Sequence, residues 1–219
     1  MKNWQKRFEL TVFKFFYPIK TLHKDRVPEG KAVIVSNHLR AIDPCCLHDV
    51  HLYDMNFISK KELFKNKLIG KFFRRYGAMP IDRENPSLQS MLGFVRVLRN
   101  NQKLVIFAEG TRNKKGTKIQ EIKSGAGSIA VMAKAPIVPV TIFEHERLFR
   151  KTYIYVGEPI ELSAFYNHKL DEQAQKQIDQ IIYNKLLENQ AKLDKYMLKV
   201  KNKKRLDNKK RAVKVKKCK

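Results

Sequence analysis

The residues best suited to chemistry lie in one short run, Ser-Asn-His-Leu-Arg-Ala-Ile-Asp-Pro, between a predicted strand and a predicted helix. His38 and Asp43 stand five positions apart in this run. A turn there can fold the carboxylate back onto the imidazole, where it accepts the Nδ1 proton and leaves Nε2 as a general base. Asp43 before Pro44 is also a good helix N-cap, and one carboxylate oxygen could serve each role. No serine or cysteine stands in a nucleophile-elbow context, so the simplest chemistry is deprotonation of a substrate hydroxyl.

A second polar group follows another apolar run and consists of Glu109, Gly110, Thr111 and Arg112. The guanidinium of Arg112 suits bidentate binding of a phosphate, with Thr111 and the amides of a glycine turn as further donors. A local ion pair between Glu109 and Arg112 is the structural alternative. On the first interpretation, this group is a phosphate-binding site.

Short apolar runs and helical patterns alternate around these groups. Strands are predicted at 31–36, 56–59, 78–81, 103–108, 137–142 and 152–156. Helices are predicted at 44–52, 68–76, 86–100, 123–134 and 168–198. The alternation predicts a single α/β domain, a mostly parallel mixed sheet flanked by helices. Ligands of such sheets bind at the carboxyl ends of the strands, where the two polar groups would meet two further cations, Lys60 and Arg83.

The segment 4–24 has the pattern of an amphipathic helix with a kink at Pro18. Its apolar residues recur on one face: Trp4, Phe8, Val12, Phe15, Ile19 and Leu22. A basic helix with Trp and Phe on its apolar face is typical of an interfacial membrane anchor. A helix packed against the core fits the pattern equally well.

The net charge of +25 requires an anionic partner, such as acidic lipid, an acidic carrier protein or nucleic acid. The segment 199–219 holds 12 Lys and Arg and one acid, Asp207, and is poor in apolar residues, which predicts a disordered tail. Its composition favours an electrostatic tether to anionic lipid. A solubilising end without a partner is the alternative.

The three cysteines include no Cys-x-x-Cys pair, which favours a reducing compartment over a disulfide framework. The sequence shows neither a signal-peptide pattern nor an apolar run of spanning length. We therefore expect a peripheral protein at the cytoplasmic face of the cell membrane.

Four ordered blocks of the sequence resemble the glycerolipid acyltransferases of the 1-acylglycerol-3-phosphate acyltransferase type. Asn-His-x4-Asp is matched by 37–43, and a block that ends in an arginine after a short strand is matched by 77–83. Phe-Pro-Glu-Gly-Thr-Arg is matched by 107–112 with Ala108 in place of proline, and an apolar run with proline by 135–140. The segment 58–63 also resembles the family, and the whole resemblance spans roughly 27–157. Four blocks in order are far more specific than one.

The resemblance implies that His38 is the general base and that Asp43 orients it. The residues that would hold the phosphate and glycerol of the acceptor are Lys60, Arg83, Glu109, Gly110, Thr111 and Arg112. The acyl donor would be a thioester of acyl carrier protein or coenzyme A, and neither a cofactor nor a metal is required. Backbone amides at the start of the helix after Asp43 are candidate donors for the tetrahedral oxyanion.

On this basis the chain divides into an interfacial helix (1–24), an acyltransferase domain (25–198) and a basic tail (199–219). The expected reaction acylates 1-acyl-sn-glycerol-3-phosphate to phosphatidic acid in phospholipid synthesis. Glycerol-3-phosphate or another lysophospholipid is the alternative acceptor.

Two functions of other classes compete with this one. A metal site built from His38, Asp43, His48 and His51 fits no standard zinc spacing. A nucleic-acid-binding role would explain the charge, but the sequence contains no recognisable nucleic-acid-binding module.

Overall fold

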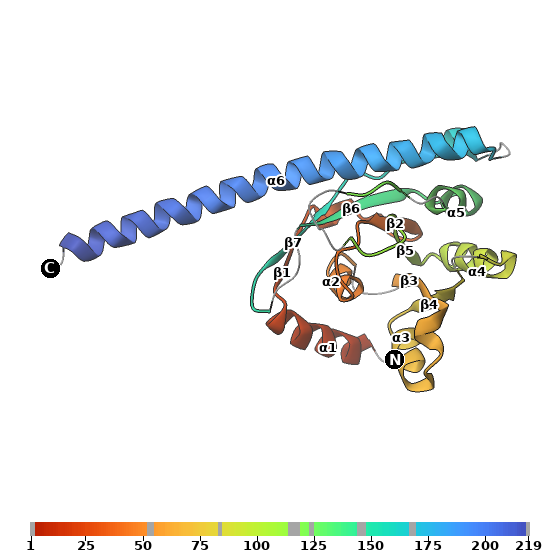
Figure 1. The fold of residues 1–219 in the computed structure, drawn as a ribbon, viewed down its shortest axis with the longest axis horizontal. Helices are drawn as coiled ribbons and strands as arrows, with labels where there is room; N and C mark the ends of the chain where they lie inside the picture. Colours follow the sequence, from red (N-terminus) through yellow and green to blue (C-terminus); the bar gives the residue numbers. More distant parts are fainter. Residues whose placement is uncertain are drawn as a thin grey trace.

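A seven-stranded sheet forms the centre of the molecule (Figure 1). The structure is a computed structural model that describes residues 3–51, 55–82, 85–113, 119–122, 125–143, 148–166 and 170–217. The strands are β1 (Ile19–Leu22), β2 (Ala32–Ser36), β3 (Met55–Lys60), β4 (Ala78–Ile81), β5 (Lys103–Phe107), β6 (Ile137–Phe143) and β7 (Thr152–Val156). Their order across the sheet is β1-β7-β6-β2-β5-β3-β4.

The strands β2 to β6 all run in one direction, because β2 pairs in parallel with β5 and β6, and β3 pairs in parallel with β4 and β5. Every residue of β2 is buried, as expected for a central strand covered on both faces. Only β7 and β1 reverse direction: β7 is antiparallel to β6, and β1 is parallel to β7. The predicted α/β fold with a mostly parallel mixed sheet is confirmed.

Helices cover both faces of the sheet, and the alternation of side chains along β2 decides what each face buries. Val33 and Val35 pack under α4 (Leu88–Arg99), α5 (Ala126–Ala133) and α6 (Glu172–Lys217). On the other face Ile34 packs with residues of α2 (Asp43–Leu47), and α1 (Asn3–Phe16) lies beside them. The remaining helices are α3 (Lys67–Arg75) and three 3-10 turns, Lys24–Arg26, Lys61–Phe64 and Ser163–Phe165.

The prediction of one helix over 4–24 was wrong in its second half. The helix α1 ends at Phe16, and Ile19–Leu22 forms β1, an edge strand paired with β7. Pro18 explains the break, because it has no N–H for the helix and disfavours helical geometry in the residue before it. Its carbonyl accepts the first bond of the new pairing, from Thr152 N–H at 2.8 Å.

The helix α6 continues through Lys217, whereas the sequence predicted disorder from Lys199. Among its described side chains the last fully buried one is Leu193, and Tyr196 and Met197 pack on the tyrosines of β7. Beyond them the helix projects from the body (Figure 1). The low apolar content of this segment prevents it from forming a hydrophobic core but does not prevent a helix, since Lys, Arg and Leu are all good helix formers.

The part of the chain that the structure describes contains no helix that is long and apolar enough to span a membrane.

Candidate active site

The predicted contact between His38 and Asp43 is present at the carboxyl end of β2. The imidazole Nδ1 lies 2.6 Å from Asp43 Oδ2. The carboxylate is fully buried, and the side chain of His38 is 14% exposed. The pair therefore presents an oriented, accessible imidazole on a buried carboxylate.

Asp43 closes the loop before α2 and does not cap the helix. Its Oδ2 accepts the backbone N–H groups of Leu39 at 2.7 Å and Arg40 at 2.9 Å, and also contacts the imidazole. The expected division of the two roles between two oxygens was wrong. The two amides stabilise the charge of the buried carboxylate and fix its direction.

Two neighbouring strands hold the His38 loop in place. The side chain of Asn37 donates to the carbonyl of Ile142 at 3.0 Å and accepts from its N–H at 2.8 Å, which ties the end of β2 to β6. The ring of Phe107, the last residue of β5, stacks on the imidazole with centroids 4.1 Å apart. Asn37, the asparagine of the first block, thus holds the His38 loop against β6. Phe107 contacts the imidazole of His38, which the sequence did not indicate.

Glu109 is buried behind the His38 loop, with 1% of its surface exposed. Burial raises the pKa of its carboxyl to about 7, and the His38 backbone amide, the Asn113 side chain and the Gln120 backbone amide oppose that rise. The alternative interpretation, an ion pair with Arg112, does not occur within the described residues. Glu109 therefore faces the loop that carries the base, not solvent.

Asn113 links the first and third blocks, a role that no sequence pattern indicated. Its backbone N–H donates to the carbonyl of His38 at 2.7 Å, and its side chain is buried. Next to it, the N–H of Ala108 donates to the carbonyl of Ser36 at 3.0 Å and extends the pairing of β2 with β5. The two loops are thus joined by main-chain bonds, which residue types alone do not reveal.

The cationic and turn residues lie at the same edge of the sheet. Lys60 ends β3 as an exposed side chain, and Thr111 and Arg112 are exposed after β5. Gly110 has a φ of 64°, a left-handed conformation that favours glycine, and its N–H donates to Phe107 at 3.1 Å. Arg83 lies outside the described residues. An ion pair between Lys61 and Asp82 joins the ends of β3 and β4 beside Lys60.

The expected oxyanion donors at the start of α2 are already engaged. The N–H groups of Cys45 and Cys46 donate to the carbonyl of Ile42 at 2.8 and 3.1 Å, and Pro44 has no N–H. The proposal that these amides stabilise the tetrahedral oxyanion was therefore wrong, because the first turn of α2 uses them internally.

The histidines of the alternative metal site do not form a metal-binding group. In the described ranges, no three or more His, Cys, Asp and Glu side chains are placed to hold an ion. His48 is buried and packs its ring against Phe57 and Tyr76, at centroid distances of 5.1 and 6.3 Å.

Comparison with known proteins places this geometry in a family. Residues 19–143 match the family model described as Acyltransferase. The 1-acyl-sn-glycerol-3-phosphate acyltransferase of Bacillus subtilis is 31% identical over 183 residues, which cover 80% of this chain and 90% of that protein. The human 1-acyl-sn-glycerol-3-phosphate acyltransferase beta is 36% identical over 135 residues, 58% of this chain and 48% of that one.

A solved structure shares the fold. The crystal structure of the 1-acyl-sn-glycerophosphate acyltransferase of Thermotoga maritima superposes with a TM-score of 0.62 at 19% identity, covering 87% of this chain and 84% of that one. The family match extends over more than half of the chain and contains the His38–Asp43 pair and the loop from Glu109 to Arg112. The chain belongs to the acyltransferase family of phospholipid synthesis.

Proposed function

We propose that this enzyme transfers a fatty acyl group from a thioester of acyl carrier protein or coenzyme A to the free hydroxyl of 1-acyl-sn-glycerol-3-phosphate. The product is phosphatidic acid. The observation that carries the proposal is the 2.6 Å contact between His38 Nδ1 and the buried Asp43 carboxylate. The names of the Bacillus and human relatives support the acceptor.

His38 acts as the general base in the proposed mechanism. Its Nε2 takes the proton of the acceptor hydroxyl while the oxygen attacks the thioester carbonyl carbon. Asp43 holds the tautomer and stabilises the imidazolium that forms. When the tetrahedral intermediate collapses, the carbon–sulfur bond breaks and the thiolate takes the proton from the imidazolium. The ester forms with no change in oxidation state and without a metal or cofactor.

The cations at the edge of the sheet bind the phosphate of the acceptor. Neither Lys60 nor Arg112 forms an ion pair within the part of the chain that the structure describes. Arg112 can bind two phosphate oxygens at once, and Thr111 adds a hydroxyl donor. Arg83 follows Asp82, which is held beside Lys60 by its pair with Lys61. Glu109 is buried and acts on this site indirectly, because it contacts the loop that carries His38.

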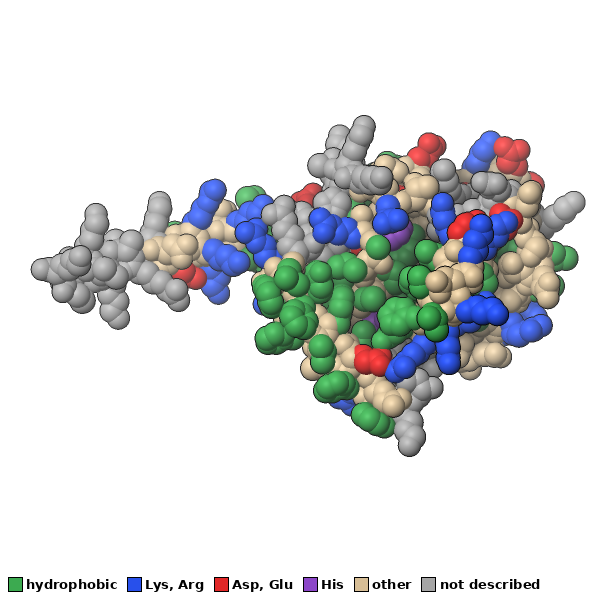
Figure 2. All heavy atoms as spheres, turned by 60° about the horizontal axis from the view of Figure 1, so that its bottom comes forward, with side chains coloured by type: hydrophobic (Ala, Val, Ile, Leu, Met, Phe, Trp, Pro, Cys, Tyr) green, Lys and Arg blue, Asp and Glu red, His purple; other side chains and the backbone are tan. Residues whose placement is uncertain are grey.

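The active edge of the sheet faces an anionic membrane, at the cytoplasmic face of the cell. Because β1 and β7 run against the other strands, their first residues lie where the others end. Phe16 and Phe149, joined there by a 2.7 Å backbone bond, are 41% and 60% exposed. Figure 2 shows hydrophobic side chains gathered on the face of α1 and α3, with Lys and Arg around them. Such a surface suits a bilayer of acidic lipid.

The mechanism is tested by changing the base and its partner separately. We expect His38→Ala and Asp43→Asn to lower the rate of transfer of labelled acyl groups to 1-acyl-sn-glycerol-3-phosphate by about 10²–10⁴-fold. His51→Ala removes a histidine outside the site and should retain activity. Circular dichroism must show a folded protein in each case. Full activity in folded His38→Ala would disprove the mechanism.

A matrix of donors and acceptors settles the substrates. Acyl carrier protein and coenzyme A thioesters are each supplied with 1-acyl-sn-glycerol-3-phosphate, glycerol-3-phosphate and a lysophospholipid without phosphomonoester. We expect Arg112→Gln to raise the KM for the phosphomonoester acceptors and to leave the donor KM unchanged. A preferred acceptor without a phosphomonoester would contradict the assignment of these cations.

A further inference from the structure

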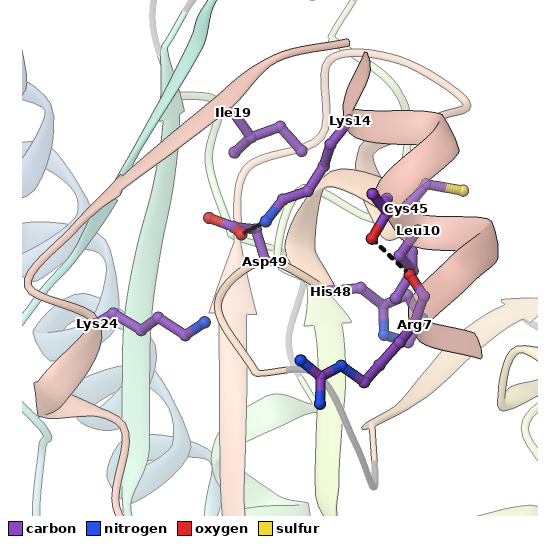
Figure 3. A pocket seen from close by; sticks show the side chains of 9 residues that line it. Arg7, Leu10, Lys14, Ile19, Lys24, Cys45, His48 and Asp49 are labelled. Carbon is purple, nitrogen blue, oxygen red and sulfur yellow. Dashed lines mark hydrogen bonds and ion pairs between the residues drawn. The ribbon is translucent and has the colours of Figure 1, made fainter. Parts of the chain in front are cut away.

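A cavity that the proposed reaction does not use lies between α1 and α2. It has a volume of about 190 Å³ and opens beside the 3-10 turn Lys24–Arg26 (Figure 3). Its lining residues come from α1, β1, the 3-10 turn and the region of α2: Arg7, Leu10, Thr11, Lys14, Ile19, Lys24, Cys45, His48 and Asp49. The two catalytic side chains are absent from this lining, since Asp43 points to the His38 loop while Cys45 and His48 line the cavity.

The cavity carries a surplus of positive charge. Its single carboxylate, Asp49, is already satisfied by an ion pair with Lys14 and by the hydroxyl of Thr21, which donates at 2.6 Å. Arg7 and Lys24 form no ion pair with any described residue. Three cations thus line a space that contains one acid.

The two uncompensated cations approach the cavity from different elements. In Figure 3 the guanidinium of Arg7 reaches in from α1, and the ammonium of Lys24 reaches in from the opposite side. The buried ring of His48 lies on the α1 side of this space. A planar guanidinium fork that faces an ammonium across a small space is a geometry that binds a multi-oxygen anion.

We propose that this cavity binds a phosphate group, at a site separate from the acceptor site, and that an anionic phospholipid head group or free phosphate supplies it. The cavity is smaller than the about 300–1,000 Å³ typical of pockets for whole drug-sized ligands, so it suits a head group and not acyl chains. It lies on the inner side of α1, whose outer side carries Trp4 at 64%, Phe8 at 66% and Phe15 at 71% exposure. A lipid phosphate held there would fix α1 against the body.

Cys45 provides a local reporter, because its half-buried thiol lines the cavity. The experiment measures the rate at which a maleimide modifies Cys45, resolved by peptide mass spectrometry from Cys46 and Cys218. The full-length protein is compared with the variant R7Q/K24Q. The matched control R96Q/R99Q removes two exposed cations from α4, on the opposite face of the sheet. The probes are inorganic phosphate and vesicles of phosphatidylcholine with or without phosphatidylglycerol.

We expect phosphate or phosphatidylglycerol vesicles to slow the modification of Cys45 several-fold in the wild type and in R96Q/R99Q, and to have no effect in R7Q/K24Q. Protection by phosphatidylglycerol vesicles alone identifies a lipid head group, and protection by inorganic phosphate identifies the free anion. The absence of protection in both arms, or equal protection in R7Q/K24Q, would overturn the proposal. Measurement in His38→Ala as well separates this result from the catalytic mechanism.

Discussion

At the scale of single residues, the buried environment of Glu109 makes the stability of the fold depend on pH. Its carboxyl is 1% exposed, beside the loop that carries His38. Burial raises its pKa from 4.5 to about 7, so the folded protein holds this proton where the unfolded chain has lost it. The free energy of unfolding therefore falls as pH rises from about 4.5 to 7 and levels off above that range.

Glu109→Gln should remove this dependence. At about 1.4 kcal/mol per pKa unit, the wild type should lose at most about 3 kcal/mol of stability relative to Glu109→Gln between pH 5 and pH 8. Urea unfolding at both pH values measures the difference. Glu62→Gln, at an exposed position, is the control and should follow the wild type. Parallel pH profiles for Glu109→Gln and the wild type would show that Glu109 ionises normally.

The residues of the active site could be predicted to different degrees. The spacing of His38 and Asp43 allowed the contact to be predicted because both residues lie in one short loop. Asn113 could not be predicted, since its bond to the carbonyl of His38 depends on the pairing of β2 with β5, which are far apart in the sequence. The burial of Glu109 could not be predicted for the same reason: the loop that buries it is distant in sequence.

At the scale of elements, α1 packs one side on the body through polar contacts and through Leu10 and Phe13, and exposes an apolar stripe on the other side. Glu9 contacts Arg75 and Tyr76 of the α3 region, and Lys14 pairs with Asp49 after α2. The apolar stripe of Trp4, Phe8, Val12 and Phe15 is exposed. Leu10 and Phe13 pack on the body while the stripe stays exposed, so α1 packs on the core and also keeps an apolar face for the proposed interfacial role.

Replacing the outer apolar side chains tests this role without removing β1, which a deletion of 1–24 would do. We expect W4S/F8S/F15S to retain its fold, because all three side chains are largely exposed. Full burial of an apolar side chain contributes about 1.5–3 kcal/mol. Loss of three partly inserted side chains should therefore weaken the binding of the variant to vesicles at least about tenfold relative to the wild type. Vesicle co-sedimentation measures it. L88S/L92S, two exposed leucines of α4, is the control. Equal loss in both variants would refute a specific role for α1.

The contact of α5 with α6 requires a glycine. A Cβ at Gly127 would lie 2.5 Å from Ile178 Cγ2, so Gly127→Ala should destabilise the fold by about 1–3 kcal/mol. Gly93 of α4 is the matched control, since its Cβ would meet nothing closer than 3.8 Å. Gly93→Ala should stabilise by about 0.4–1 kcal/mol. Urea unfolding of both variants checks the packing, and an unchanged Gly127→Ala would contradict it.

Six of the strands could be predicted because apolar runs bounded by polar residues carry a local signal. The strand β1 could not, since Ile19 and Leu22 stand three residues apart, a spacing that also fits a helix. Its conformation is decided by pairing with Thr152–Tyr155, more than a hundred residues away. An edge strand of this kind depends on its partner rather than on its own sequence.

At the scale of the whole molecule, the reversal of β1 and β7 places the active site and the apolar surface together. The sequence predicted the fold class from the alternation of elements but not the order β1-β7-β6-β2-β5-β3-β4. That order depends on long-range pairing, for which a local pattern carries no signal. The consequence is functional under the proposed mechanism: the base meets its lipid acceptor at the edge that faces the membrane.

The projecting part of α6 concentrates positive charge outside the core. Residues 199–219 hold 12 Lys and Arg against Asp207, and no side chain after Leu193 is fully buried among those described. A chain that ends at Leu198 should therefore unfold with nearly the same free energy as the full chain. Its binding to anionic vesicles should weaken and become less dependent on salt. Each engaged cation contributes about 1 kcal/mol, so the loss of two or three cations should lower the vesicle affinity about tenfold or more.

A full-length variant with glutamine at the Lys and Arg positions of 199–219 separates charge from length. If the proposed tether is correct, this variant binds anionic vesicles as weakly as the truncated chain, and both bind neutral vesicles like the wild type. Unchanged binding in both would exclude a lipid tether. Tight, salt-sensitive binding of DNA or RNA that survives His38→Ala and disappears with these charges would instead favour the nucleic-acid alternative. These variants therefore test which partner the charge of α6 binds, separately from the chemistry of the body.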